Sequence, residues 1–107
     1  KSKELQRAIE NCDLLVNTTP IGMHPRPDRC PIDVDYKINS KAVVYDLVYN
    51  PMETKLLKWA KSNGAKPITG LGMLIRQALL TFSLFTEEEA SYKVMEQAAL
   101  KALRSFK

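Results

Sequence analysis

Three short segments of the sequence hold residue types that bind ligands, and each follows an apolar run. They are residues 17–23 (NTTPIGM), 47–50 (LVYN) and 69–73 (TGLGM). The apolar runs before them have the composition of β-strands. Ligands of open α/β sheets bind outside the carboxyl ends of the strands. Hydroxyl, amide, glycine and tyrosine residues at these three positions therefore indicate one shared binding site.

The strands that would position these segments are short. Residues 14–16 form a compact apolar run, residues 42–49 are rich in β-branched and aromatic residues, and residues 66–69 form a third short segment. Asp46 alone interrupts the second run. Near-continuous apolarity is typical of strands covered on both faces of a parallel sheet, so we expect buried strands here.

Helical periodicity fills much of the remaining chain, and we expect helices over residues 3–10, 51–62, 71–85 and 91–106. The second helix would have Asn50 as its N-cap, with Pro51 at the first helical position and Glu53 at the third. Asn63 and Gly64 would end it in a left-handed stop. The proline-rich residues 22–39 are expected to form a loop, with room for one short helical turn.

The helix expected over residues 71–85 is apolar nearly all round. Such a helix is buried on more than one side, and one thin sheet cannot cover it, so its other face should meet something absent from this chain. The last helix carries an apolar stripe that runs to Phe106. The three glutamates at 87–89 favour a solvated helix start near Thr86.

The order of these elements is helix, strand, long loop, strand, helix, strand, helix, helix. Alternation of this kind predicts an α/β fold with parallel strands joined by right-handed crossovers. It is typical of half of a doubly wound sheet. A length of 107 residues, with 45% hydrophobic and 26% charged residues, predicts at most one globular domain.

Several other classes of protein do not fit the sequence. No stretch reaches the roughly 20 apolar residues of a membrane span, and the opening KSKELQR leads into no signal sequence. The net charge of +4 is modest and comes with no nucleic-acid-binding motif. Cys12, His24 and Cys30 lack metal-site spacing. We expect a reduced cytoplasmic setting, and the missing initiator Met suggests a fragment.

Three motifs in a fixed order identify a resemblance. LVNTTPIGM (residues 15–23), VVYDLVYNP (43–51) and GLGMLIRQA (70–78) resemble the shikimate dehydrogenase family, and the joint match covers essentially the whole chain. The resemblance implies the C-terminal part of a cytoplasmic NADP-dependent enzyme that interconverts 3-dehydroshikimate and shikimate on the route to aromatic amino acids. The implied fold is the C-terminal half of a Rossmann-like domain, with about three parallel strands flanked by helices.

The same resemblance implies where the cofactor NADP would lie. Thr18 and Thr19, with their neighbours in the NTTP segment, would lie near its nicotinamide-side ribose and phosphates. Leu47 would contact the nicotinamide. Gly70 would let the backbone approach the cofactor closely because it has no Cβ, and Met73 would lie beside it.

Two residues match substrate contacts of the family, namely Tyr49 and Gln77. Gln77 is one helical turn beyond Met73 and faces the same side of the helix, whereas Arg76 should be a surface or interface residue. The alternatives are that Leu47 and Tyr49 are core residues of a buried strand, and that Gln77 makes an interdomain hydrogen bond.

Several parts of the family pattern are missing from this chain. They are the glycine-rich turn, the loop that selects the 2′-phosphate, and the catalytic Lys and Asp of the substrate domain. We therefore assign no catalytic residue and no metal ligand, and we expect weak or no NADP binding by the chain alone.

The expected partners follow from the same resemblance. They are shikimate or 3-dehydroshikimate in the intact enzyme, and either the missing N-terminal portion or a second copy as cover for residues 71–85, with no nucleic acid and no membrane. The alternatives are a self-associating interaction domain without a ligand and a quinate-using or dual-specific relative. The choice between NAD and NADP stays open.

Overall fold

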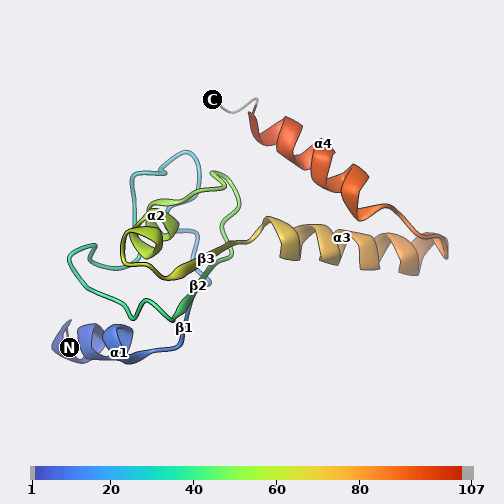
Figure 1. Ribbon diagram of the computed structural model, residues 1–107. Helices are drawn as coiled ribbons and strands as arrows, with labels where there is room; N and C mark the ends of the chain where they lie inside the picture. Colours follow the sequence, from blue (N-terminus) through green and yellow to red (C-terminus); the bar gives the residue numbers. More distant parts are fainter. Residues whose placement is uncertain (1, 105–107) are drawn as a thin grey trace. The chain divides into compact units, whose positions relative to one another are not determined.

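The computed structural model describes residues 2–104, and its helices and strands alternate as the sequence predicts (Figure 1). The elements are α1 (Ser2–Asn11), β1 (Leu14–Asn17), β2 (Val43–Asp46), α2 (Lys55–Ser62), β3 (Lys66–Thr69), α3 (Leu71–Thr86) and α4 (Tyr92–Arg104). The chain divides into two compact units, with the boundary between Gly70 and Leu71. The first unit holds the sheet with α1 and α2, and the second holds α3 and α4. The expectation of a single domain stays a prediction.

The sheet has three parallel strands in the order β1-β2-β3. Leu14 pairs with Val43 and Val43 pairs with Lys66, so the strands run in register from one end to the other. The expected α/β class, with three parallel strands flanked by helices, is confirmed.

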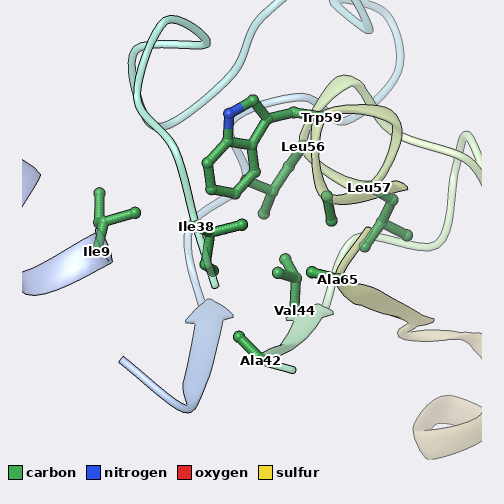
Figure 2. Close-up of a cluster of buried hydrophobic side chains, with 9 residues drawn as sticks. Ile9, Ile38, Ala42, Val44, Leu56, Leu57, Trp59 and Ala65 are labelled. Atoms are coloured by element: carbon green, nitrogen blue, oxygen red, sulfur yellow. The ribbon is translucent and has the colours of Figure 1, made fainter. Parts of the chain in front are cut away.

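Helix α2 supplies four of the nine residues of the buried core cluster (Figure 2). Leu56, Leu57, Trp59 and Ala60 are buried because they recur on one side of this helix. Their neighbours in the cluster are Ile9, Ile38, Ala42, Val44 and Ala65. The Trp59 indole Nε1 also donates a hydrogen bond to the Tyr36 carbonyl at 2.8 Å, which anchors the long loop to the helix.

The expected start of this helix at Pro51 is wrong, because Thr54 and not Asn50 is the N-cap. The Thr54 backbone is extended, and its hydroxyl oxygen accepts from the Leu57 N–H at 3.2 Å. Thr54 is buried, so it can cap the helix and bind to the sheet at the same time. The expected stop is confirmed, since α2 ends at Ser62 and Gly64 has a φ of +79°.

Two expectations about the strands also need correction. Strand β2 ends at Asp46 and not at Tyr49, because the Asp46 side chain accepts the Val48 N–H at 3.0 Å and turns the chain away from the ladder. Strand β1 is buried on one face only: Leu14 on its other face is 57% exposed, and Val16 is also exposed.

The second unit is a pair of helices joined by a short link. Arg76 of α3 lies over the Tyr92 ring of α4, 5.0 Å from its centroid. On α3 the buried residues are Leu71 and Ile75, whereas Leu84 and Phe85 are largely exposed, Phe85 to 85%. The expectation that α3 is buried on more than one side is therefore not met within the described residues, although its apolar composition is as predicted.

The three glutamates at 87–89 predicted a helix start near Thr86, and this prediction is wrong. Helix α3 continues to Thr86, and Glu87 then takes a left-handed φ of 56°. The Thr86 hydroxyl donates to the Phe82 carbonyl and accepts from the Glu88 N–H, which stabilises this end. The next helix begins only at Tyr92, and the expected extension of its apolar stripe to Phe106 lies outside the described residues.

The long loop over residues 22–39 is confirmed, but its expected helical turn is replaced by hydrogen-bonded turns. Arg26 N donates to the Met23 carbonyl at 2.9 Å, and Tyr36 N donates to the Asp33 carbonyl at 3.1 Å. Among residues 2–104, none of the helices combines the length and apolar character that crossing a bilayer requires.

Leu56→Ala should destabilise the first unit by about 2–5 kcal/mol, because Leu56 is 1% exposed and its truncation leaves a cavity. Urea unfolding followed by the fluorescence of Trp59, the one tryptophan of the chain, measures this loss. Leu80→Ala is the matched control at an exposed position, with an expected change within about 0.5 kcal/mol. Equal losses for both variants would contradict the described core.

Candidate functional site

The carboxyl ends of the three strands meet at one edge of the sheet. Asn17, Asp46 and Thr69 are the last residues of β1, β2 and β3, and they are neighbours in the register. One further bond, from Leu47 N to the Asn17 carbonyl at 3.1 Å, continues the ladder beyond β2. The three segments singled out in the sequence therefore begin side by side.

A buried carboxylate lies at the centre of this edge. Asp46 is 0% exposed. Its Oδ1 accepts from Asn17 Nδ2 at 3.0 Å and from Val48 N at 3.0 Å, and its Oδ2 accepts from the Thr54 hydroxyl at 2.6 Å. A carboxylate can be buried only when hydrogen bonds replace its hydration. These bonds tie the ends of β1 and β2 to the start of α2.

The NTTP segment forms a tight turn around the Asn17 side chain. Asn17 Oδ1 accepts from Thr19 N at 3.0 Å and from the Thr19 hydroxyl at 2.6 Å, while its Nδ2 donates to the Ile21 carbonyl at 3.2 Å. The Thr19 oxygen in turn accepts from Ile21 N. Thr18 and Thr19 remain exposed, so the hydrogen bonds that hold the turn leave its outer surface accessible.

Gly70 lies against the backbone of Leu47. A Cβ on Gly70 would lie 2.6 Å from the Leu47 carbonyl carbon, 2.8 Å from its Cα and closer still to its carbonyl oxygen. Real Cβ atoms do not approach other atoms so closely. Glycine is therefore required here by the chain itself, a reason for its presence that is separate from the expected approach of the cofactor.

Leu47 and Tyr49 differ in burial. Leu47 is half-buried, and Tyr49 is 37% exposed. An exposed phenol does not fit the alternative that Tyr49 is a core residue. The Asn50 carbonyl accepts from His24 N at 2.7 Å. This hydrogen bond joins the residue after the first motif (15–23) to the end of the second motif (43–51).

The hydroxyl of Thr69 is a buried polar group with no hydrogen-bond partner in the structure. Such groups are few in native proteins. Thr69 pairs with Asp46 in the register and is followed directly by Gly70. The edge of the sheet therefore retains one unsatisfied polar atom.

A cavity of about 160 Å³ opens between the end of β1 and the start of α2. Its apolar lining comes from three elements, with the two threonines of the turn at its border; the residues are Leu15, Val16, Asn17, Thr18, Thr19, Pro31, Ile32 and Leu56. Pockets that bury a small molecule hold about 300–1,000 Å³. This cavity is therefore large enough for only part of a ligand.

Met73 and Gln77 lie one turn apart on α3 and are exposed. They belong to the second unit. The structure thus brings five of the seven predicted site residues to the edge of one sheet: Thr18, Thr19, Leu47, Tyr49 and Gly70. The roles of all seven residues stay predictions.

Burial also affects the two free thiols, which pack against the core. Desolvation by burial raises the pKa of Cys12 and that of Cys30 above their usual value. A raised thiol pKa lowers the fraction of reactive thiolate, so neither cysteine has the character of a nucleophile. Among residues 2–104, no three His, Cys, Asp or Glu side chains are grouped to hold a metal ion.

Two residues of the site were missed in the sequence. In the sequence pattern Asp46 is an interruption of an apolar strand, and Thr54 falls within the expected helix over residues 51–62. A single charged residue inside an apolar run was the available signal, since such a residue must find buried partners. Nothing in the sequence showed that Thr54 would be one of these partners.

Comparison with known proteins gives a consistent result. Residues 70–100 match the family model described as the Shikimate 5'-dehydrogenase C-terminal domain. The chain is 45% identical over 101 residues to the shikimate dehydrogenase (NADP(+)) of Methanopyrus kandleri, covering 94% of this chain and 35% of that protein. The resemblance drawn from the three motifs is confirmed.

Solved structures agree with this similarity. The shikimate 5-dehydrogenase of Thermus thermophilus, in complex with NADP(H) and shikimate, aligns with a TM-score of 0.80 and 35% identity over 91% of this chain and 36% of that one. The quinate dehydrogenase of Corynebacterium glutamicum, in complex with NAD, aligns with a TM-score of 0.82 and 35% identity over 94% of this chain and 35% of that one. The chain spans about a third of the length of the relatives it matches.

Gly70→Ala should destabilise the first unit by about 1–3 kcal/mol, because the new methyl group forces the Leu47 backbone to move. Urea unfolding followed by Trp59 fluorescence measures the change. Gly72→Ala is the matched control: its Cβ would lie 3.4 Å from the Tyr92 hydroxyl, an ordinary contact, and alanine favours a helix. A Gly70→Ala protein as stable as the wild type would contradict the close approach.

Proposed function

We propose that this chain is the C-terminal part of an NADP-dependent shikimate dehydrogenase, which interconverts 3-dehydroshikimate and shikimate by hydride transfer. The observation that carries the proposal is the convergence of the three motifs at one sheet edge, where Thr19, Leu47 and Gly70 follow the carboxyl ends of neighbouring strands. The similarity to NADP-dependent relatives over 94% of the chain supports it. The reaction belongs to the biosynthesis of chorismate and aromatic amino acids, and we assign the protein to the cytoplasm.

The residues at this edge suit the nicotinamide half of NADP. Thr18 and Thr19 offer exposed hydroxyls, and Leu47 offers a half-buried apolar surface against which a flat ring can pack. Gly70 leaves room for the Leu47 backbone because it has no Cβ, and Met73 completes the assigned cofactor contacts. When bound, the cofactor supplies or accepts the hydride.

Substrate binding is assigned to Tyr49 and Gln77. A phenol and a primary amide both donate and accept hydrogen bonds, as recognition of a polyol carboxylate requires. Exposure of both side chains leaves these groups accessible. No catalytic residue of the family has a counterpart in this chain, so proton transfer is assigned to the remainder of the intact protein.

Two alternatives keep specific support. A quinate or dual-specific dehydrogenase is favoured by the similarity to a quinate dehydrogenase at a TM-score of 0.82. A self-associating domain without a ligand is favoured by the exposed apolar residues of α3, among them Leu80, Leu84 and Phe85. A well-folded monomer in light scattering would contradict the second alternative.

The activity is tested on the intact protein that contains this segment. With NADP+ it should oxidise shikimate at a higher kcat/KM than quinate, as followed by the appearance of NADPH. Gln77→Ala should raise the KM for shikimate about tenfold, the loss expected for one hydrogen bond to the substrate, and change the KM for NADP little. Gln97→Ala, at an exposed position of α4, is the control of the same residue type. Unchanged KM values in Gln77→Ala would remove Gln77 from the site, whereas no oxidation of shikimate by the wild type would refute the function.

The isolated chain should bind NADP weakly or not at all. A glycine-rich turn at a helix N-terminus supplies much of the affinity for a dinucleotide, and the family's pyrophosphate-binding turn has no counterpart in this chain. Isothermal titration calorimetry of the 107-residue chain with NADP measures this. A micromolar dissociation constant would contradict the prediction.

A further inference from the structure

The orientation of the Asn17 side-chain amide is fixed by its backbone partners. The Ile21 carbonyl only accepts, so the Asn17 atom 3.2 Å from it is Nδ2. The Thr19 N–H only donates, so the Asn17 atom 3.0 Å from it is Oδ1. The two backbone groups therefore agree on one orientation of the amide.

Asp46 stabilises the same orientation. An ionised carboxylate only accepts hydrogen bonds, so Asp46 Oδ1 pairs with the Nδ2 of Asn17 and cannot pair with its oxygen. Asn17 is 5% exposed and Asp46 is 0% exposed. A flipped amide would place two acceptors face to face without water, an arrangement that is unfavourable in a buried network.

The orientation of Asn17 determines what Thr19 can offer. The single hydroxyl proton of Thr19 is donated to Asn17 Oδ1 at 2.6 Å. One lone pair of the same oxygen accepts from Ile21 N at 3.2 Å. The exposed Thr19 hydroxyl therefore has one lone pair left, with which it can accept a hydrogen bond but cannot donate one.

We propose that Asp46 is a positioning residue that makes Thr19 a hydrogen-bond acceptor, so that Thr19 binds a hydroxyl of the nicotinamide-side ribose and not a phosphate. Pyrophosphate oxygens accept hydrogen bonds and do not donate them, so they would repel the free lone pair of Thr19. A phosphate contact in this loop falls to Thr18, whose hydroxyl is exposed. The inference rests on the proposed function, which brings a dinucleotide to this loop. Within that function it assigns Thr19 to the ribose and Thr18 to a phosphate.

A double-mutant cycle in the intact protein tests this chain of contacts. Asp46→Asn keeps the shape of the side chain and gives it a donor, whereas Thr19→Val keeps the shape and removes the hydroxyl. Each substitution should raise the KM for NADP about tenfold with a small change in kcat. The KM of the double variant should be no higher than that of either single variant, because both substitutions remove the same contact. Additive effects of the two substitutions on KM would overturn the proposal.

Thr54→Val separates positioning from stability. It removes another donor to the Asp46 carboxylate and the cap of α2, but leaves the contact with Asn17. It should lower the midpoint of urea unfolding without changing the KM for NADP. An increase of that KM equal to the increase in Asp46→Asn would show a merely structural role and overturn the proposal.

Two further arms decide the matter if Asp46→Asn does not fold. Thr19→Ser should retain the wild-type KM for NADP. An NADP analogue without the nicotinamide-ribose hydroxyls should bind the wild type about as weakly as NADP binds Thr19→Val. The affinity of this analogue should fall little further in Thr19→Val. If Thr19→Val weakens the analogue as much as it weakens NADP, Thr19 does not bind the ribose.

A wild-type protein without dehydrogenase activity would refute the proposed function by itself. In that case NMR of the intact protein still decides the role of Asp46. The Asn17 side-chain amide protons should exchange slowly with water, and faster in Asp46→Asn. Fast exchange in the wild type would contradict the positioning role.

Discussion

The carboxylate of Asp46 is removed from water, and hydrogen bonds from three segments of the first unit compensate for this. Asn17 ends β1, Val48 lies between β2 and Tyr49, and Thr54 caps α2. Loss of the acceptor would leave three inward-facing donors, each of which costs about 1–3 kcal/mol when it stays unpaired and buried. The positions of two candidate ligand-binding segments and of one helix therefore depend on a single side chain.

The remaining geometry of the edge follows from close packing around this centre. The parallel register brings the ends of all three strands together. Because Gly70 lacks a Cβ, the chain leaving β3 can lie against the Leu47 backbone. The result is a sheet edge with exposed threonines on the first segment and an exposed tyrosine on the second. In the second unit, α3 exposes large apolar residues such as Leu84 and Phe85, and exposed apolar patches are typical of interaction surfaces.

The sequence was sufficient to predict the fold class and the strands that precede the three motifs, because both depend on periodicity and on element order. It was not sufficient to predict the start of α2, since Asn50 and Pro51 have good local propensity, while the N-cap was decided by a bond between Thr54 and Asp46 eight residues away. The expected end of β2 failed for a related reason: a side chain captured the Val48 N–H. Gly70 was predicted to matter, but its contact with Leu47 joins segments that are far apart in the sequence and follows from no local pattern.

The similarity to shikimate dehydrogenases covers most of this chain and about a third of the relatives' length, and the function that we propose makes the carboxyl edge of the sheet one wall of a binding site. A crystal structure of the intact protein with NADP and shikimate is the most direct test. We expect the nicotinamide-side ribose at Thr19, the nicotinamide ring against Leu47, and shikimate within hydrogen-bonding distance of Tyr49 and Gln77. A cofactor bound away from the carboxyl edge of β1, β2 and β3 would contradict it.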